Sequence, residues 1–532
     1  MQALSLRRSS STPRIYLLAA LLLFSPSLLI CSRKLETNHH RHVRRVNGGD
    51  SPTYIWPLPL NYTLGNLTLT VDPNLSLVAG GNGGGSHIIS EAFNRYRSII
   101  FKHASFELPG VVIDYDLNKL SIIVHAEDEQ LQLGVDESYT LTVDASEGPS
   151  VINGITIEAN SVYGALRGLE TLSQLCTYDY GTKTVKLYNA PWYVRDKPRF
   201  IYRGLLLDTS RHYLPVEVIK QVIESMSYAK LNVLHWHIID EESFPLEVPM
   251  YPNLWKGAYT KWERYTIDDA SDIVQGEGYP DLWPSPSCQE PLDVSKNFTF
   301  DLITGILSDL RKVFPFELFH LGGDEVHTDC WNSTPHVKQW LEDRNMTAKD
   351  AYKYFVLRAQ DIAVSLNWTP VNWEETFNTF ATSLNRKTVV HNWLESGVCP
   401  RAVAKGFRCI FSNQGVWYLD HLDVPWDKVY YAEPLEGITG ALQQKLVLGG
   451  EVCMWGETAD ASNVQQTIWP RAAAAAERLW SNKESLSSQN SSVLARLEHF
   501  RCLLTRRGVP AAPVTNFYAR SSPKGPGSCY TQ

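Results

Sequence analysis

Carboxylates and tryptophans stand at the ends of six short apolar runs beyond residue 200. They are Asp208, Asp240, Asp324 with Glu325, Trp373 with Glu374, Trp393, and Trp455 with Glu457. Any one of them alone could be a helix N-cap or a rim residue. Because six runs end alike, while a packed interior prefers Val, Ile and Leu, the pattern favours one shared pocket.

The motifs of several enzyme classes are missing from the sequence. There is no His-Glu-x-x-His, no Cys-x-x-Cys, no Walker phosphate loop and no Gly-x-Ser-x-Gly. The metallohydrolase, kinase and serine hydrolase classes therefore lack their signatures. Carboxylates among aromatic rings are instead typical of glycoside hydrolysis. No metal or cofactor is expected.

Asp324 and Glu325 form the strongest pair of candidate catalytic carboxylates. Glycosidases ordinarily place two carboxylates on opposite sides of the scissile bond. Because adjacent residues leave a strand from one edge, this pair cannot easily flank a sugar ring. One can serve as the acid while the other supports it, and the nucleophile then comes from elsewhere, including the substrate.

The elements that must position these residues are strands alternating with helices. Strands are expected at Ile201–Asp208, Val233–Asp240, Leu318–Glu325, Thr369–Trp373, Thr388–Trp393, Phe407–Ser412 and Leu446–Trp455, and helices at Val216–Lys230, Phe300–Val313, Ala348–Ser365 and Arg471–Trp480. This alternation predicts an α/β fold with a TIM-type (β/α)8 barrel over residues 199–505. The active site of such a barrel lies at the carboxyl ends of the strands.

A smaller domain is expected before the barrel, over residues 51–190. Short runs with period-two alternation, such as Leu120–Val124 and Tyr139–Val143, indicate strands. Ser161–Leu175 has leucines on one helical face, so we expect a small α+β domain. A Pro-punctuated connection separates it from the barrel. Residues 506–532 are expected to form a C-terminal tail.

Five motifs resemble glycoside hydrolase family 20, the β-N-acetylhexosaminidases. They are Arg203–Tyr213 (RGLLLDTSRHY), His235–Asp240 (HWHIID), His320–Val326 (HLGGDEV), Gly450–Glu457 (GEVCMWGE) and Trp469–Arg471 (WPR). The similarity covers about Pro57 to Cys529 and is closest to the vacuolar enzymes of plants.

The resemblance implies an exo-glycosidase that removes terminal β-linked GlcNAc or GalNAc with retention. Glu325 would be the general acid and base, Asp324 would hold the acetamido N–H of the substrate, and Tyr418 would donate to the acetamido oxygen. Substrate-binding residues are implied at Arg203, Asp240, Trp373, Trp393, Asp420, Trp455 and Glu457. Because no Arg follows Asp420, neutral sugars are expected over sulfated ones.

The chain departs from the family pattern between Asp240 and Phe300. The helical pattern that begins at Thr266 stops at Gln275, and no apolar strand-like run follows. The family would continue there with a third barrel strand and a Pro-Gly-His turn, whose His contacts the general acid together with the residue that matches Asp240. The resemblance therefore predicts a barrel without its third strand.

Two functions from different classes follow from this departure. One is the active exo-glycosidase, with N-glycans and chito-oligosaccharides as substrates. The other is a catalytically impaired isoform, either a sugar-binding protein or one that fails to fold, because a missing strand leaves neighbours with unpaired edges. Family members commonly dimerise, so a homodimer is also expected. The formal net charge of -8 provides no basic field for nucleic acid.

The N-terminus predicts entry into the secretory pathway. Arg7, Arg8 and Arg14 precede the apolar run Ile15–Ile30, which favours a signal peptide and leaves an uncleaved membrane anchor as the alternative. Glycosylation acceptors occur at Asn61, Asn66, Asn74, Asn297, Asn332, Asn345, Asn367 and Asn490. A vacuolar, lysosome-like or extracellular destination is expected.

Disulfides are expected because the secretory compartment is oxidising. The family resemblance implies the pairs Cys288 with Cys330 and Cys502 with Cys529. It assigns no partner to Cys176, Cys399, Cys409 and Cys453.

Overall fold

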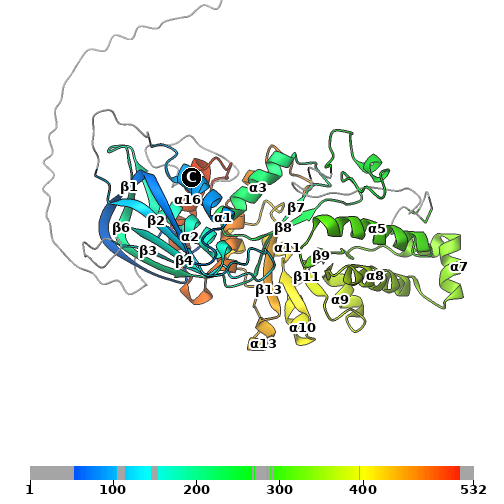
Figure 1. Ribbon diagram of the computed structural model, residues 1–532. Helices are drawn as coiled ribbons and strands as arrows, with labels where there is room; N and C mark the ends of the chain where they lie inside the picture. Colours follow the sequence, from blue (N-terminus) through cyan, green and yellow to red (C-terminus); the bar gives the residue numbers. More distant parts are fainter. Residues whose placement is uncertain are drawn as a thin grey trace, which may run out of the picture. The chain divides into compact units, whose positions relative to one another are not determined.

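The computed structural model describes residues 53–104, 114–144, 154–266, 269, 284–285, 288, 291–394 and 396–515. Within these residues the strands form two separate sheets, one before residue 197 and one after residue 201 (Figure 1). No helix in this part has the length and apolarity needed to cross a bilayer. The apolar run Ile15–Ile30 lies outside it.

The first sheet has six strands in the order β1-β2-β4-β3-β6-β5. The strands are β1 (Asn61–Gly80), β2 (Leu117–Val124), β3 (Tyr139–Val143), β4 (Ile155–Ala159), β5 (Cys176–Asp179) and β6 (Thr184–Asp196). The first part of β1 pairs antiparallel with β6, and its second part pairs parallel with β2. Two amphipathic helices, α1 (His87–Ile100) and α2 (Val162–Leu175), bury their apolar faces against this sheet. The expectation of a small α+β fold with a helix-covered sheet is confirmed.

The second sheet has seven parallel strands in the order β8-β7-β13-β12-β11-β10-β9. They are β7 (Tyr202–Asp208), β8 (Val233–His237), β9 (Leu318–His320), β10 (Thr369–Trp373), β11 (Val389–Asn392), β12 (Arg408–Phe411) and β13 (Val447–Met454). Every strand predicted for the barrel is present. Strand β9 is shorter than the predicted Leu318–Glu325, because positive φ angles at Gly322 and Gly323 turn the chain out of the sheet.

The helices of the barrel follow its strands along the chain. They are α3 (Val216–Tyr228), α5 (Asn297–Val313), α6 (Asp329–Ser333), α7 (Pro335–Asp343), α8 (Ala348–Ser365), α9 (Glu374–Phe380), α10 (Val398–Ala404), α11 (Gln414–Trp417), α12 (Trp426–Tyr431), α13 (Ala441–Gln444), α14 (Val464–Ile468), α15 (Arg471–Trp480) and α16 (Asn490–Arg506), with 3-10 helices at Leu254–Gly257 and Lys483–Ser485. The four predicted barrel helices correspond to α3, α5, α8 and α15. Helix α8 starts at a capping box formed by Thr347 and Asp350.

Strands β8 and β9 form the two ends of the sheet, and no strand of the described residues joins them. All residues of β7 and β13 are buried, whereas every residue of β8 and β9 is partly exposed. The missing third strand would lie between these two edges. The fold is therefore a partial TIM-type barrel that is open at the position predicted from the sequence.

Buried ion pairs join the first sheet to the barrel. The Nζ atom of Lys230 is fully buried and donates to Tyr139 Oη (2.9 Å), Thr171 Oγ1 (2.9 Å) and Asp196 Oδ2 (3.0 Å). The indole of Trp480 also donates to Asp196 Oδ2, at 3.0 Å. Because each polar atom has a partner, the network offsets much of the cost of taking these charges out of water.

Two disulfides lie in the described part of the barrel. Cys288 is bonded to Cys330, as the resemblance implies, and Cys399 is bonded to Cys409. Cys502 is disulfide-bonded, while its expected partner Cys529 lies outside the described residues. The thiols of Cys176 and Cys453 are free.

The buried pair gives a stability prediction. Lys230→Met should lower the free energy of unfolding by about 3–5 kcal/mol, because Asp196 then stays buried without its counter-charge. Urea unfolding followed by circular dichroism measures the change. The control is Lys338→Met, since Lys338 and Glu342 form an exposed pair at 4.0 Å whose loss costs at most about 1 kcal/mol. Equal losses in the two variants would contradict the role given to Lys230.

Candidate active site

Four aromatic side chains meet at the carboxyl ends of the barrel strands. Trp373 ends β10, Trp393 follows β11, and Trp455 follows β13. Tyr418 lies beside β13 through a bridge to Cys453. The ring centroids of neighbouring pairs are 5.9–6.4 Å apart, and the rings of Trp393 and Tyr418 are nearly parallel. The structure thus brings together all the aromatic residues predicted for the sugar pocket.

Asp324 and Glu325 lie in the turn after β9. Burial raises the pKa of Asp324 to about 6, and the carboxylates of Asp240 and Glu325 add to the effect. Glu325 is exposed, has a φ of 47°, and has no hydrogen-bond partner among the described residues. Both residues line a cavity of about 290 Å³ whose apolar walls include Trp331 and Phe355.

Arg211 is the centre of an ionic group beside the aromatic cluster. Its guanidinium lies 2.7 Å from Asp240 Oδ2, 3.3 Å from Asp208 Oδ2 and 3.0 Å from Glu242 Oε2. It also lies 5.4 Å from the ring centre of Trp455. Arg211 belongs to the motif Arg203–Tyr213, and its position three residues beyond the end of β7 is the feature of the sequence that could have indicated its role.

The side chain of Asp240 contacts His237 and Arg211. Burial alone would raise the pKa of this carboxyl, but His237 and Arg211 outweigh burial and hold the pKa below its ordinary value. The distance from His237 Nε2 to Asp240 Oδ2 is 2.8 Å. Asp240 is therefore ionised and supports the ionic group around Arg211.

The predicted contact between Arg203 and a sugar hydroxyl is wrong. Arg203 stands at the amino end of β7, opposite to the aromatic cluster, and is fully buried. Its guanidinium donates to both oxygens of Glu137 at 2.7 Å and to the carbonyls of Phe200 and Lys230. Burial would raise the pKa of Glu137, but Arg203 and Arg167 lower it to about 2. Arg203 is thus part of the ionic contacts between the two sheets.

Asp420 and Glu457 lie near Asp208 on the polar side of the site. Burial raises the pKa of both carboxyls, and the charge of Asp208 raises each further. The Oδ1 atom of Asp420 is buried without a hydrogen-bond partner. The backbone N–H of Gly456 donates to Asp208 Oδ2 at 2.9 Å, which ties the loop after β13 to the end of β7. Asp420 Oδ1 can therefore accept a further hydrogen bond.

The two glutamates after Trp373 have different environments. Glu374 is fully buried and accepts from the Asn392 side chain and the Trp393 backbone at 2.7 Å, so it joins the ends of β10 and β11. Glu375 accepts from Trp393 Nε1 at 3.0 and 3.1 Å. Burial raises the pKa of Glu375 to about 7. Sequence reasoning missed Glu375, which orients one wall of the aromatic cluster.

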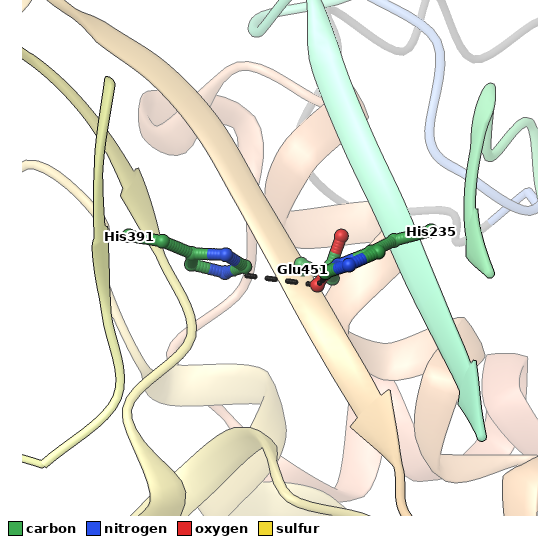
Figure 2. Close-up of side chains that lie close together, drawn as sticks. All are labelled: His235, His391 and Glu451. Carbon is green, nitrogen blue, oxygen red and sulfur yellow. Dashed lines mark hydrogen bonds and ion pairs between the residues drawn. The ribbon is translucent and has the colours of Figure 1, made fainter. Parts of the chain in front are cut away.

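The side chains of His235, His391 and Glu451 lie close together (Figure 2), and both histidine rings are near Trp373 of the aromatic cluster. The distance from His235 Nδ1 to Glu451 Oε1 is 2.9 Å, and that from His391 Nε2 to the same oxygen is 3.6 Å. Trp373 stacks on His391 with ring centroids 4.3 Å apart. Within the described residues, this is the group whose side-chain spacing could accommodate a metal ion.

Comparison with protein families gives two matches along the chain. The model described as "Glycosyl hydrolase family 20, catalytic domain" matches residues 200–277 and 282–483. The model "beta-acetyl hexosaminidase like" matches residues 55–175. The chain belongs to glycosyl hydrolase family 20. The family predicted from the five motifs is confirmed.

Relatives of this family 20 chain match over nearly its whole length. Beta-hexosaminidase 1 of Arabidopsis thaliana is 65% identical over 514 residues, which cover 91% of this chain and 95% of that protein. Beta-hexosaminidase 3 of the same plant is 51% identical, covering 90% of this chain and 94% of that protein. Among solved structures, the chitobiase of Flavobacterium johnsoniae matches with a TM-score of 0.74 and 27% identity, covering 86% of this chain and 73% of that one.

The raised pKa values predict how two site variants respond to pH. A carboxyl whose folded pKa exceeds its unfolded value destabilises the fold as pH rises through the interval between the two. Asp324→Asn and Glu375→Gln remove this penalty. The difference in melting temperature between each variant and the unmodified chain should therefore shift in favour of the variant from pH 5 to pH 8. Differential scanning fluorimetry at both pH values measures the gain.

The control for this experiment is Glu342→Gln, which changes an exposed carboxylate far from the cluster. Its melting temperature should track that of the unmodified chain at both pH values. A Glu375→Gln variant that behaves like this control would contradict the buried placement of the Glu375 carboxyl.

Proposed function

We propose that the chain is an exo-β-N-acetylhexosaminidase acting on terminal β-linked GlcNAc or GalNAc of glycans such as N-glycans and chito-oligosaccharides. The supporting observation is the cluster of four aromatic rings at the carboxyl ends of the strands of a family 20 barrel, with Asp324 near enough for its charge to act on Tyr418. Aromatic rings present apolar faces to a sugar ring, and carboxyl groups supply acid–base chemistry.

The reaction uses the substrate's own acetamido group as the nucleophile. Glu325 protonates the leaving glycosidic oxygen while the acetamido oxygen bonds to the anomeric carbon, which gives an oxazolinium intermediate. Glu325 then takes a proton from the water that attacks the same carbon. The bond between this carbon and the acetamido oxygen breaks, which restores the acetamido group, and the product keeps the β configuration. Asp324 in its ionised form accepts the acetamido N–H and stabilises the positive charge. Tyr418 donates to the acetamido oxygen.

Arg211, rather than Arg203, contacts a hydroxyl of the substrate sugar. Its guanidinium lies on the open side of the site, beside Trp455 and between Asp208 and Asp240. From this position it can donate to a hydroxyl of a bound sugar. Asp420 and Glu457 supply acceptors for further hydroxyls, and their carboxyl groups disfavour a sulfated sugar.

Glu325 follows β9, one of the two strands at the ends of the sheet. Its exposed carboxyl lacks a hydrogen-bonding neighbour among the described residues, and the segment that supplies one in the family is missing from the sequence. An acid that is free to rotate spends less time in the productive orientation. The alternative function, a sugar-binding protein with little turnover, is the second outcome of the activity test.

Turnover of aryl N-acetyl-β-D-glucosaminide and galactosaminide by the purified chain tests the proposal. Glu325→Gln should lower kcat by about 10²–10⁴-fold, because it removes the general acid without changing the volume of the side chain. Glu342→Gln is the matched control and should leave kcat unchanged. A folded chain that binds N-acetylglucosamine but turns over neither substrate would establish the alternative.

We also propose that the chain enters the secretory pathway and reaches a vacuolar, lysosome-like or extracellular compartment, where it forms a homodimer. All eight acceptor asparagines are exposed, as attachment of an oligosaccharide requires. Removal of N-glycans by an endoglycosidase should increase the gel mobility of the chain expressed in plant cells. Unchanged mobility would contradict this route.

N-terminal sequencing distinguishes a cleaved signal from an anchor, and light scattering gives the oligomeric state.

A further inference from the structure

A line of polar contacts crosses the barrel interior from the catalytic turn to the buried carboxylate of Glu451. The backbone N–H of Gly322 donates to His320 Nδ1 at 3.1 Å. The Nε2 atom of His320 lies 3.2 Å from His391 Nδ1. The Nε2 atom of His391 faces Glu451 Oε1 at 3.6 Å (Figure 2). Hydrogen-bond contacts thus connect Gly322, His320 and His391, and the Nε2 atom of His391 has no hydrogen-bond partner among the described residues and faces the charge of Glu451 from beyond hydrogen-bond distance.

The positions of the protons on the two histidine rings follow from the hydrogen bond that the backbone N–H of Gly322 donates to His320. A backbone N–H can only donate, so His320 Nδ1 must be the unprotonated nitrogen. In a neutral ring the proton is then on Nε2, which donates to His391 Nδ1. His391 therefore carries its own proton on Nε2, directed at Glu451. Burial lowers the pKa of both rings, that of His391 to about 4, so both are neutral near neutral pH.

Glu451 is the fixed acceptor at the end of the line. It is fully buried and accepts from Tyr202 Oη at 2.5 Å and from His235 Nδ1 at 2.9 Å. Burial would raise the pKa of Glu451, but His235 and His391 outweigh burial and lower it. Both ring nitrogens that face this carboxylate carry protons and offer no lone pair to a cation. The group is a carboxylate surrounded by donors.

The catalytic turn needs such an anchor because its backbone is unusual. Gly322, Gly323 and Glu325 have φ angles of 65°, 95° and 47°. A positive φ is costly for a residue with a side chain, so Glu325 keeps it only where surrounding contacts hold the turn. Asn372 and Tyr352 donate to the carbonyls of Gly322 and Gly323. The contact from Gly322 N–H to His320 fixes the preceding peptide unit, between Leu321 and Gly322.

We propose that His320 and His391 are positioning residues that hold the turn carrying Asp324 and Glu325, and that the negative charge of Glu451 favours the His391 tautomer with its proton on Nε2. The inference rests on the proposed function for its effect on turnover. Without an acceptor at position 391, the Nε2 proton of His320 is buried and unpaired. Moving that proton to Nδ1 would place it against the N–H of Gly322 and release the turn. His391 also supports the ring of Trp373, so the same change would loosen the pocket wall.

His391→Leu and His391→Gln form a matched pair for the test. Gln can accept from His320 through its carbonyl and donate to Glu451 through its amide, whereas Leu can do neither. His391→Leu should lower kcat by about 10²-fold with a much smaller change in KM, because a displaced acid affects the transition state more than binding. His391→Gln should restore most of the activity. Equal activity of the two variants would overturn the proposal.

Two further measurements do not depend on turnover. In the full chain labelled with ¹⁵N-histidine, His320 should show an unprotonated Nδ1 and a protonated Nε2; the opposite tautomer would overturn the proposal even if His391→Leu does not fold. Hydrogen exchange of the peptide containing Gly322 should be faster in His391→Leu than in His391→Gln. If these results appear but the unmodified chain has no turnover, the proposed function fails while the positioning role stands.

Discussion

Parallel hydrogen bonding between strands is the constraint on which the site depends. Because β7, β10, β11 and β13 run in one direction and in register, Asp208 lies beside His237 and Trp373 beside His391 at the same edge of the sheet. The site residues are separated by up to about half of the chain in sequence, so only this pairing brings them together. Loss of the third strand interrupts the pairing at one place and leaves the other six contacts between neighbouring strands intact.

Buried charge is used in two ways in this fold. At the amino ends of the strands, Lys230 and Arg203 each meet a carboxylate at close range and join the barrel to the first sheet. At the carboxyl ends, burial without a full set of partners raises the pKa of Asp324 and Glu375. The first arrangement stabilises ionised groups. The second raises the pKa of the carboxyls toward neutral pH, where a proton can be gained or lost.

Much of the fold and part of the site could be predicted from the sequence. The strands were predictable because each is a short apolar run, and the gap between β8 and β9 because no such run follows Asp240. Arg203 was misplaced because a motif gives the order of residues but not the end of the strand on which each stands. Glu375 and His391 were missed because their roles depend on contacts with Trp393 and His320, which no spacing within one segment reveals.

Strands β8 and β9 present backbone N–H and C=O groups along edges that no described strand covers. Such edges are templates on which a strand from another molecule can add. Here the exposed ladders are only five and three residues long, so an added strand would gain few hydrogen bonds at each edge. The shortness of the two strands at the described ends of the sheet therefore disfavours edge-to-edge association between copies of the chain.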